Sequence, residues 1–149
     1  MGLYRTEEKQ PIMAKDIIHE PVKKALENGG WIVTAENFTV RYEELIIYPD
    51  IAAERVIAAE RGLLKIAVEV KSFIGKSTVN DMKDAIGQYV IYQTYLADLE
   101  PERQVYMAIS TRVYHDIFQL KAIQRLIERF GIKLIVVDIE QKEIVAWIE

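Results

Sequence analysis

Residues 66–73 most tightly constrain how this chain can fold, because an otherwise apolar run there carries a glutamate and a lysine. Side chains alternate between the two faces of a β-strand, so Glu69 and Lys71 share one face with Ala67. An unpaired buried ion is costly by several kcal/mol. The run therefore predicts a strand whose two charged groups either pair with each other or open onto a polar cleft.

A second carboxylate, Asp50, follows Pro49 at the start of another apolar segment. Residues 51–61 have helix-forming composition, but Gly62 interrupts the chain just before the charged run, and we interpret the two segments as a long β-hairpin. Extended strands joined by a turn near residues 61–64 would place Asp50 opposite about residues 70–75. If residues 51–61 are helical, a crossover must bring Asp50 there instead.

Helical periodicity predicts two helices around this hairpin. The first covers residues 15–28 and stops at Gly29 and Gly30. The second starts at Ser77 and Thr78, with Thr78 and Asp81 fitting a capping box, and runs to about Leu96. One face of this helix carries polar and aromatic side chains: Asp81, Asp84, Gln88, Tyr92 and Tyr95. Gly87 interrupts the helix, and we expect close backbone packing there.

Short strands are predicted at residues 31–34, 38–41 and 45–48, and the C-terminal part alternates between strands and a helix. Its expected elements are a strand at 105–109, helical residues 114–130, and strands at 133–137 and 143–147. This order predicts an α/β fold in which helices flank a central mixed β-sheet.

Composition limits the class of protein. The 149 residues suit a single domain, which we place at 13–149, with residues 1–12 as a flexible extension and either Met1 or Met13 as the native start. The chain has no cysteine, no apolar run long enough for a membrane and no signal-peptide pattern, so we expect a cytoplasmic protein. Its net charge of −4 argues against strong autonomous binding to nucleic acid, unless a local cleft, a metal ion or a partner compensates.

The predicted meeting of Asp50, Glu69 and Lys71 suits metal-assisted hydrolysis of a phosphodiester. Carboxylates are the hard oxygen ligands that Mg²⁺ or Mn²⁺ prefers, and Mg²⁺ usually takes one or two of them beside waters and phosphate oxygens. The ammonium of Lys71 can stabilise the charge of the transition state, while the metal lowers the pKa of the attacking water.

Pro49 and Asp50 are followed, after eighteen residues, by Glu69, Val70 and Lys71. This pattern resembles the PD-(D/E)XK signature of restriction-endonuclease-like nucleases. The wider sequence resembles the XisH family, the excision-controlling factors of the cyanobacterial fdxN element. The resemblance starts near residue 13 and is carried by residues 12–19, 30–31, 53–55, 58–60, 66–73 and 87–89.

The resemblance implies a restriction-endonuclease-like fold with Asp50 and Glu69 as metal ligands and Lys71 as the catalytic lysine. Glu20 or His19 would add a group from the first helix, and Gln88 one from the following helix. It also implies a role in site-specific DNA rearrangement beside a recombinase and a small XisI-like partner. A homodimer would suit this role, because cutting both strands generally needs two sites.

Other readings of the same residues stay open. Glu69 and Lys71 could form a surface ladder or a structural ion pair in a retired site, which would make the protein a non-catalytic accessory or scaffold. A regulatory module of the toxin or phage-defence kind is a third reading. His19 could be a capping or packing residue, and Gln88 could belong to a helix face that packs on the sheet.

Overall fold

The computed structural model describes residues 18–47 and 56–149, so Asp50 and the start of the helix predicted over 15–28 lie outside its described residues. An N-terminal helix (residues 18–28) comes first. The elements that follow are, in chain order, β1 (Ile32–Ala35), β2 (Val40–Tyr42), β3 (Leu45–Ile47), β4 (Val56–Arg61), β5 (Leu64–Val70), α2 (Thr78–Leu99), β6 (Arg103–Ser110), α3 (Thr111–Asp116), α4 (Lys121–Phe130), β7 (Leu134–Asp138) and β8 (Glu143–Ile148).

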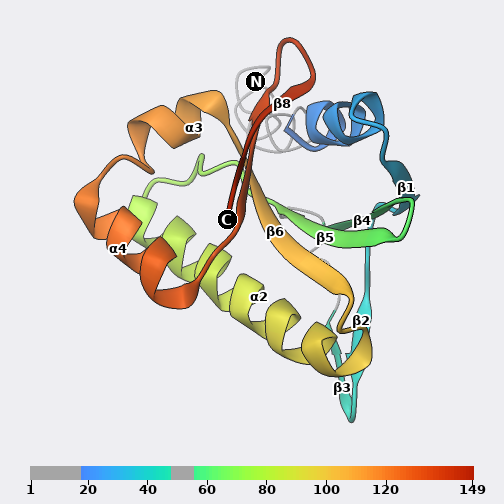
Figure 1. The fold of residues 1–149 in the computed structure, drawn as a ribbon. Coiled ribbons are helices and arrows are strands. Elements are labelled where there is room, and N and C mark those ends of the chain that lie inside the picture. Colours follow the sequence, from blue (N-terminus) through green and yellow to red (C-terminus); the bar gives the residue numbers. More distant parts are fainter. Residues whose placement is uncertain (1–17, 48–55) are drawn as a thin grey trace, which may run out of the picture.

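The centre of the fold is a six-stranded mixed sheet in the order β1-β4-β5-β6-β7-β8 (Figure 1). Strands β5, β6 and β7 run parallel to one another, and the pairs β1/β4, β4/β5 and β7/β8 are antiparallel. The parallel step from β5 to β6 needs a crossover connection, which α2 supplies. This architecture confirms the predicted α/β class with a mixed sheet flanked by helices.

The ambiguous segment before Gly62 is a strand throughout its described part, residues 56–61. It forms a hairpin with β5 in a register that pairs Val56 with Glu69 and Arg61 with Leu64. Gly62 occupies the turn at φ 61°, a conformation that glycine adopts without steric cost. Residues 56–59 are buried between β1 and β5, so burial in the sheet overrides the helix propensity of this composition.

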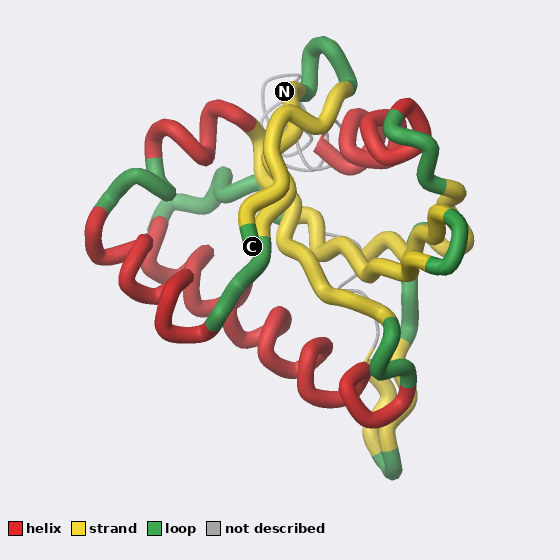
Figure 2. The backbone as a smooth tube through the Cα atoms, in the orientation of Figure 1, coloured by secondary structure: helices red, strands yellow, loops and turns green. Residues whose placement is uncertain are grey.

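Helices cover both faces of the sheet (Figure 2). Each covered face forms its own apolar core. The core under α2 includes the buried side of that helix: Met82, Ala85, Tyr89, Tyr92 and Leu96. The core on the other face contains the buried side of the N-terminal helix: Ile18, Val22, Ala25 and Leu26. Alternation along β5 divides its side chains between these two cores, with Ala67 under α2 and Val68 under the N-terminal helix.

Helix α2 differs from its prediction in two details, the N-cap and the packing at Gly87. Its N-cap is Ser77, whose hydroxyl accepts a hydrogen bond from the Asn80 amide at 3.1 Å, so Thr78 is the first helical residue and not the cap. A side-chain carbon added at Gly87 would meet no described atom within 4 Å, so the expected close packing there is wrong.

One other segment departs from the expected pattern, and two of the predicted short strands form a sheet of their own. The helix predicted over 114–130 is broken into α3 and α4, and Phe118 in the connection is buried in the core under α2. Strands β2 and β3 form a separate two-stranded sheet. This hairpin lies beside the C-terminal end of α2 (Figure 1), where the ring of Tyr42 stacks on Tyr95 with centroids 4.3 Å apart.

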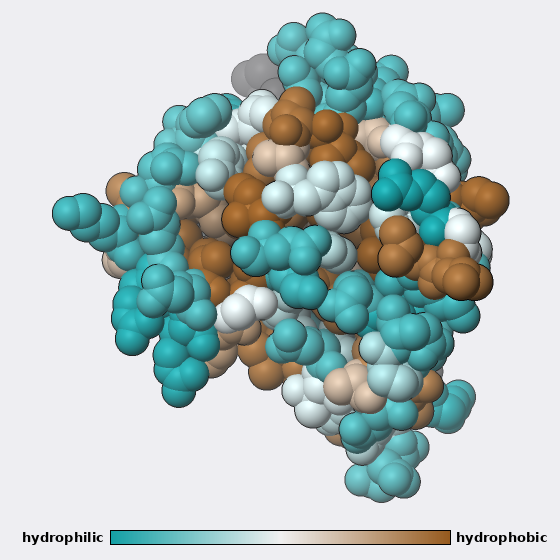
Figure 3. Space-filling model, in the orientation of Figure 1, coloured by the Kyte–Doolittle hydropathy of each residue, from teal (hydrophilic) through white to brown (hydrophobic). Residues whose placement is uncertain are grey.

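The surface mixes apolar and polar side chains. Figure 3 shows hydrophobic patches on this face of the molecule separated by hydrophilic residues. Among the described helices, none is both long and apolar enough to cross a membrane.

Candidate active site

Glu69 occupies a central position on the sheet, beneath α2. Its neighbours in the register are Val56 on β4 and Met107 on β6, both members of the core under α2. The charge of Glu69 acts on two tyrosines of α2. Burial, with a smaller contribution from Glu69, raises the pKa of Tyr92 to about 12. Burial is also the main cause that raises the pKa of Tyr89, and Glu69 adds to it. The carboxylate therefore lies in an apolar layer close to two phenol rings.

Lys71 follows the end of β5 and is close to Glu69. Its Nζ lies 3.6 Å from Glu69 Oε2, and its backbone amide continues the parallel ladder with a 3.0 Å hydrogen bond to the Ala108 carbonyl. The predicted adjacency of these two groups is therefore observed. The alternative prediction, an open polar cleft, is not observed, because Glu69 is only 1% exposed and Lys71 only 4% exposed.

The loop after Lys71 is fixed to the rest of the molecule at three points. Phe73, in the left-handed region at φ 53°, packs edge-on against Phe118 with centroids 5.3 Å apart. The Gly75 amide donates to Asp81 Oδ2 at 2.9 Å, and a side chain at Gly75 would collide with this carboxylate. With the Ser77 cap, these contacts determine how the chain passes from the glutamate–lysine pair into α2.

The pair supplies one carboxylate and one ammonium, which are part of the set of groups that a hydrolytic metal site uses. One ionised carboxylate is a single hard ligand, and the neighbouring ammonium balances its charge, so a divalent ion would need a further carboxylate. Asp50 is the residue predicted to supply it, and it lies outside the described part of the chain. Gln88 is half-buried on α2, one turn before Tyr92.

His19 and Glu20 belong to the N-terminal helix, which packs on the opposite face of the sheet from Glu69. The structure groups them with Glu36, just after β1, and the three side chains offer ligand atoms within 4.8 Å of one another. His19 Nε2 is 3.0 Å from Glu36 Oε1, and Lys23 Nζ donates to Glu36 Oε2, also at 3.0 Å. Sequence reasoning missed Glu36, because a single carboxylate after a strand carries no spacing signal that links it to a helix 13 to 17 residues earlier.

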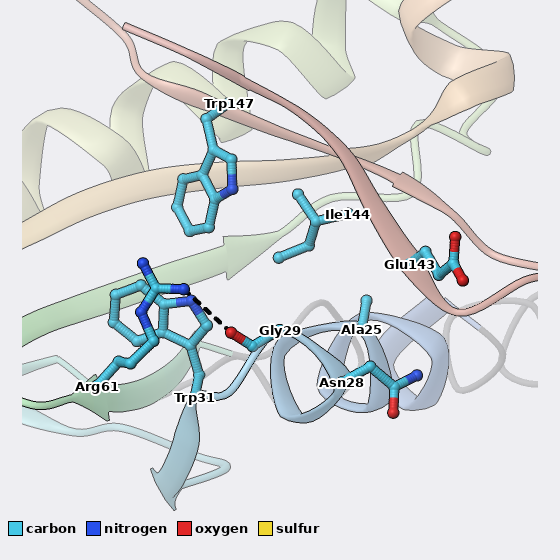
Figure 4. Close-up of a pocket in the computed structure, with 8 residues that line it drawn as sticks. All are labelled: Ala25, Asn28, Gly29, Trp31, Arg61, Glu143, Ile144 and Trp147. Atoms are coloured by element: carbon cyan, nitrogen blue, oxygen red, sulfur yellow. Dashed lines mark hydrogen bonds between the residues drawn. The ribbon is translucent and has the colours of Figure 1, made fainter.

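A separate pocket of about 300 Å³ lies between the N-terminal helix and β8 (Figure 4). Two indoles, Trp31 and Trp147, contribute to its wall. The guanidinium of Arg61 lies over the Trp31 ring at 4.8 Å and donates to the Gly29 carbonyl at 3.0 Å. The residues around this pocket include neither Glu69 nor Lys71, so the pocket does not provide access to the pair.

Comparisons with known proteins agree with the fold and with the resemblance to the XisH family. Residues 12–145 match the family described as XisH protein. A crystal structure of an XisH family protein from Nostoc punctiforme is 35% identical with a TM-score of 0.81, covering 89% of this chain and 99% of that one. A fdxN element excision controlling factor protein from Anabaena variabilis is 36% identical with a TM-score of 0.82, covering 90% and 99% respectively. No curated protein matches the chain.

Proposed function

This chain belongs to the XisH family, and we propose that it controls the excision of a DNA element through a metal-dependent phosphodiester site built on Glu69 and Lys71. The excision role rests on the relative from Anabaena variabilis, which is described as an excision controlling factor. In this proposal the protein acts on DNA beside a recombinase and a small XisI-like partner, as a restriction-endonuclease-like member of the PD-(D/E)XK group.

The buried ion pair is the observation that carries the chemical part of the proposal. Two ions in an apolar layer are poor stabilisers, because replacing such a pair with apolar side chains of similar volume is often neutral or stabilising. Glu69 and Lys71 nevertheless lie 3.6 Å apart beneath α2, with both side chains almost fully buried. A chemical use would explain why the chain carries this pair at a position where apolar side chains could serve the fold as well.

The residues divide the proposed work between them. Glu69 and Asp50 would hold Mg²⁺ or Mn²⁺, and such an ion supplies an attacking water of lowered pKa. Lys71 would place its ammonium beside the phosphate, where it stabilises the negative charge that develops in the transition state. The buried surroundings strengthen this interaction, because charges attract more strongly in a low-dielectric environment.

Burial also favours a second candidate function. DNA cannot contact side chains as enclosed as Glu69 and Lys71 while the site stays closed. A non-catalytic accessory that joins DNA, recombinase and partner protein would keep the pair only as an inherited structural feature.

Excision in living cells separates these two functions. We expect a chromosomal Glu69→Gln variant to lose excision of the element, measured by quantitative PCR across the excised junction, while a Glu128→Gln variant keeps it. Glu128 is an exposed residue of α4 and serves as the matched control. Protein level must be equal in the two strains. Full excision in the Glu69→Gln strain would reject the catalytic role and support the accessory.

A further inference from the structure

We propose that His19, Glu20 and Glu36 form a second cation site, which binds a divalent transition-metal ion of the Zn²⁺ type. Their potential ligand atoms, one imidazole nitrogen and two carboxylate oxygens, lie within 4.8 Å of one another. The Phe38 amide bonds the Val56 carbonyl, so the segment that carries Glu36 runs beside the start of β4. The cluster therefore lies towards the same end of the sheet as Glu69, with the sheet between them.

The distance between His19 and Glu36 suits shared coordination of one ion. Ligand atoms that lie about 2.1 Å from zinc are separated by about 3.4 Å at a tetrahedral angle. His19 Nε2 and Glu36 Oε1 are 3.0 Å apart, so a small outward shift would admit the ion between them. Glu20, adjacent to His19 on the helix, completes three protein ligands and leaves the remaining positions to water.

Of the three potential ligands, His19 is buried and held in place, whereas Glu20 and Glu36 are open to solvent. The His19 side chain is 4% exposed and that of Glu36 is 40% exposed, so a fixed imidazole faces a carboxylate that solvent can reach. The His19 Nδ1 atom is buried and has no hydrogen-bond partner within the described residues. Glu36 is therefore the one described group seen to orient this ring, and an ion can enter from the solvent side.

The local charges hold the carboxylate in its ligating form. Hydrogen bonds from His19 and Lys23 keep the pKa of Glu36 below its ordinary value, so the carboxylate stays ionised. The ammonium of Lys23, whose side chain is 25% exposed, donates to the second oxygen of Glu36. A bound cation would repel this ammonium, which is long and flexible enough to turn towards water or Glu27.

The ligand set selects the class of metal. Imidazole suits zinc and the later first-row metals, whereas sites made only of oxygen suit Mg²⁺, Ca²⁺ and Mn²⁺. The proposed site at Asp50 and Glu69 offers oxygens alone, so the two sites would take different ions. The chain has no cysteine and only two histidines, which leaves His19 and the exposed His115 as its imidazole ligands.

Zinc titration of the full chain, followed by NMR of the histidine rings, tests the site. We expect the ring signals of His19 to shift and saturate at one Zn²⁺ per chain, and those of His115 to stay unchanged. A His115→Gln variant assigns the two rings. Calorimetry under the same conditions gives the dissociation constant.

Three variants separate a metal site from a hydrogen-bonded network. Glu36→Gln should weaken Zn²⁺ binding at least tenfold, since even groups that only support a ligand contribute about 10- to 100-fold. Lys23→Met should bind Zn²⁺ as tightly or more tightly, because a competing cation is gone, and Glu128→Gln should behave as wild type. All three change exposed or half-buried positions, so the fold is expected to survive.

Two results would overturn the site: equal Zn²⁺ affinity in wild type and Glu36→Gln, or zinc-induced shifts confined to His115. A Glu69→Gln variant is expected to keep the full zinc response of His19. This keeps the outcome independent of whether Glu69 takes part in DNA cleavage.

Discussion

Replacing Lys71 with methionine is expected to lower the free energy of unfolding by about 3–5 kcal/mol, the usual cost of removing one partner from a buried ion pair. The change leaves Glu69, which is 1% exposed, without the ammonium that now lies 3.6 Å away. Methionine fills a similar volume, so loss of packing contributes little. Urea unfolding at neutral pH, monitored by tryptophan fluorescence, gives the difference.

Two further variants show that charge is the cause. Lys121→Met, at an exposed position of α4, should change the free energy of unfolding by less than about 0.5 kcal/mol. A double variant that adds Glu69→Leu to Lys71→Met should recover most of the lost stability, because no buried ion is then left. A cost below about 1 kcal/mol for Lys71→Met alone would show that Glu69 is well compensated by other groups.

Mg²⁺-dependent nicking of supercoiled plasmid by the purified protein is expected to fall by about 10²–10³-fold in Glu69→Gln, the range seen when one group that stabilises a transition state is removed. Glutamine keeps the shape of the side chain and removes the charge that would hold the ion. The measurement is the initial rate of conversion from supercoiled to open-circular DNA at saturating Mg²⁺, and again with Mn²⁺.

Loss of folding has to be separated from loss of chemistry in this experiment. Circular dichroism of Glu69→Gln should match that of the wild type, and Glu128→Gln should nick at the wild-type rate. Wild-type protein that binds DNA and cleaves it with no divalent ion at all would contradict a metal-dependent site. Binding without any cleavage across the divalent ions would leave the accessory role as the function.

Much of the fold follows from local sequence. The alternation around Glu69 predicts β5, and Gly62 predicts the turn that makes residues 56–61 a strand despite their helix-forming composition. The limits are equally local. Ser77 and Thr78 compete for the same cap, and only the backbone geometry decides for Ser77. The break between α3 and α4 reflects burial of Phe118, which helical periodicity does not encode.

The site is less accessible to sequence reasoning than the fold. Alternation places Glu69 and Lys71 together, but it does not say what covers them, and the covering helix α2 follows later in the chain. His19 and Glu36 meet because β1 returns beside the N-terminal helix, a tertiary contact without a sequence signature. The role of Asp50 stays a prediction.

Crystals of this protein grown with Mn²⁺ test the central claim most directly, through the anomalous scattering of the metal. We expect a peak within about 2.6 Å of the Glu69 carboxylate, with Asp50 as a second ligand and Lys71 beside it. A Glu69–Lys71 pair that stays closed at 3.6 Å, with manganese bound only elsewhere on the molecule, would contradict the account.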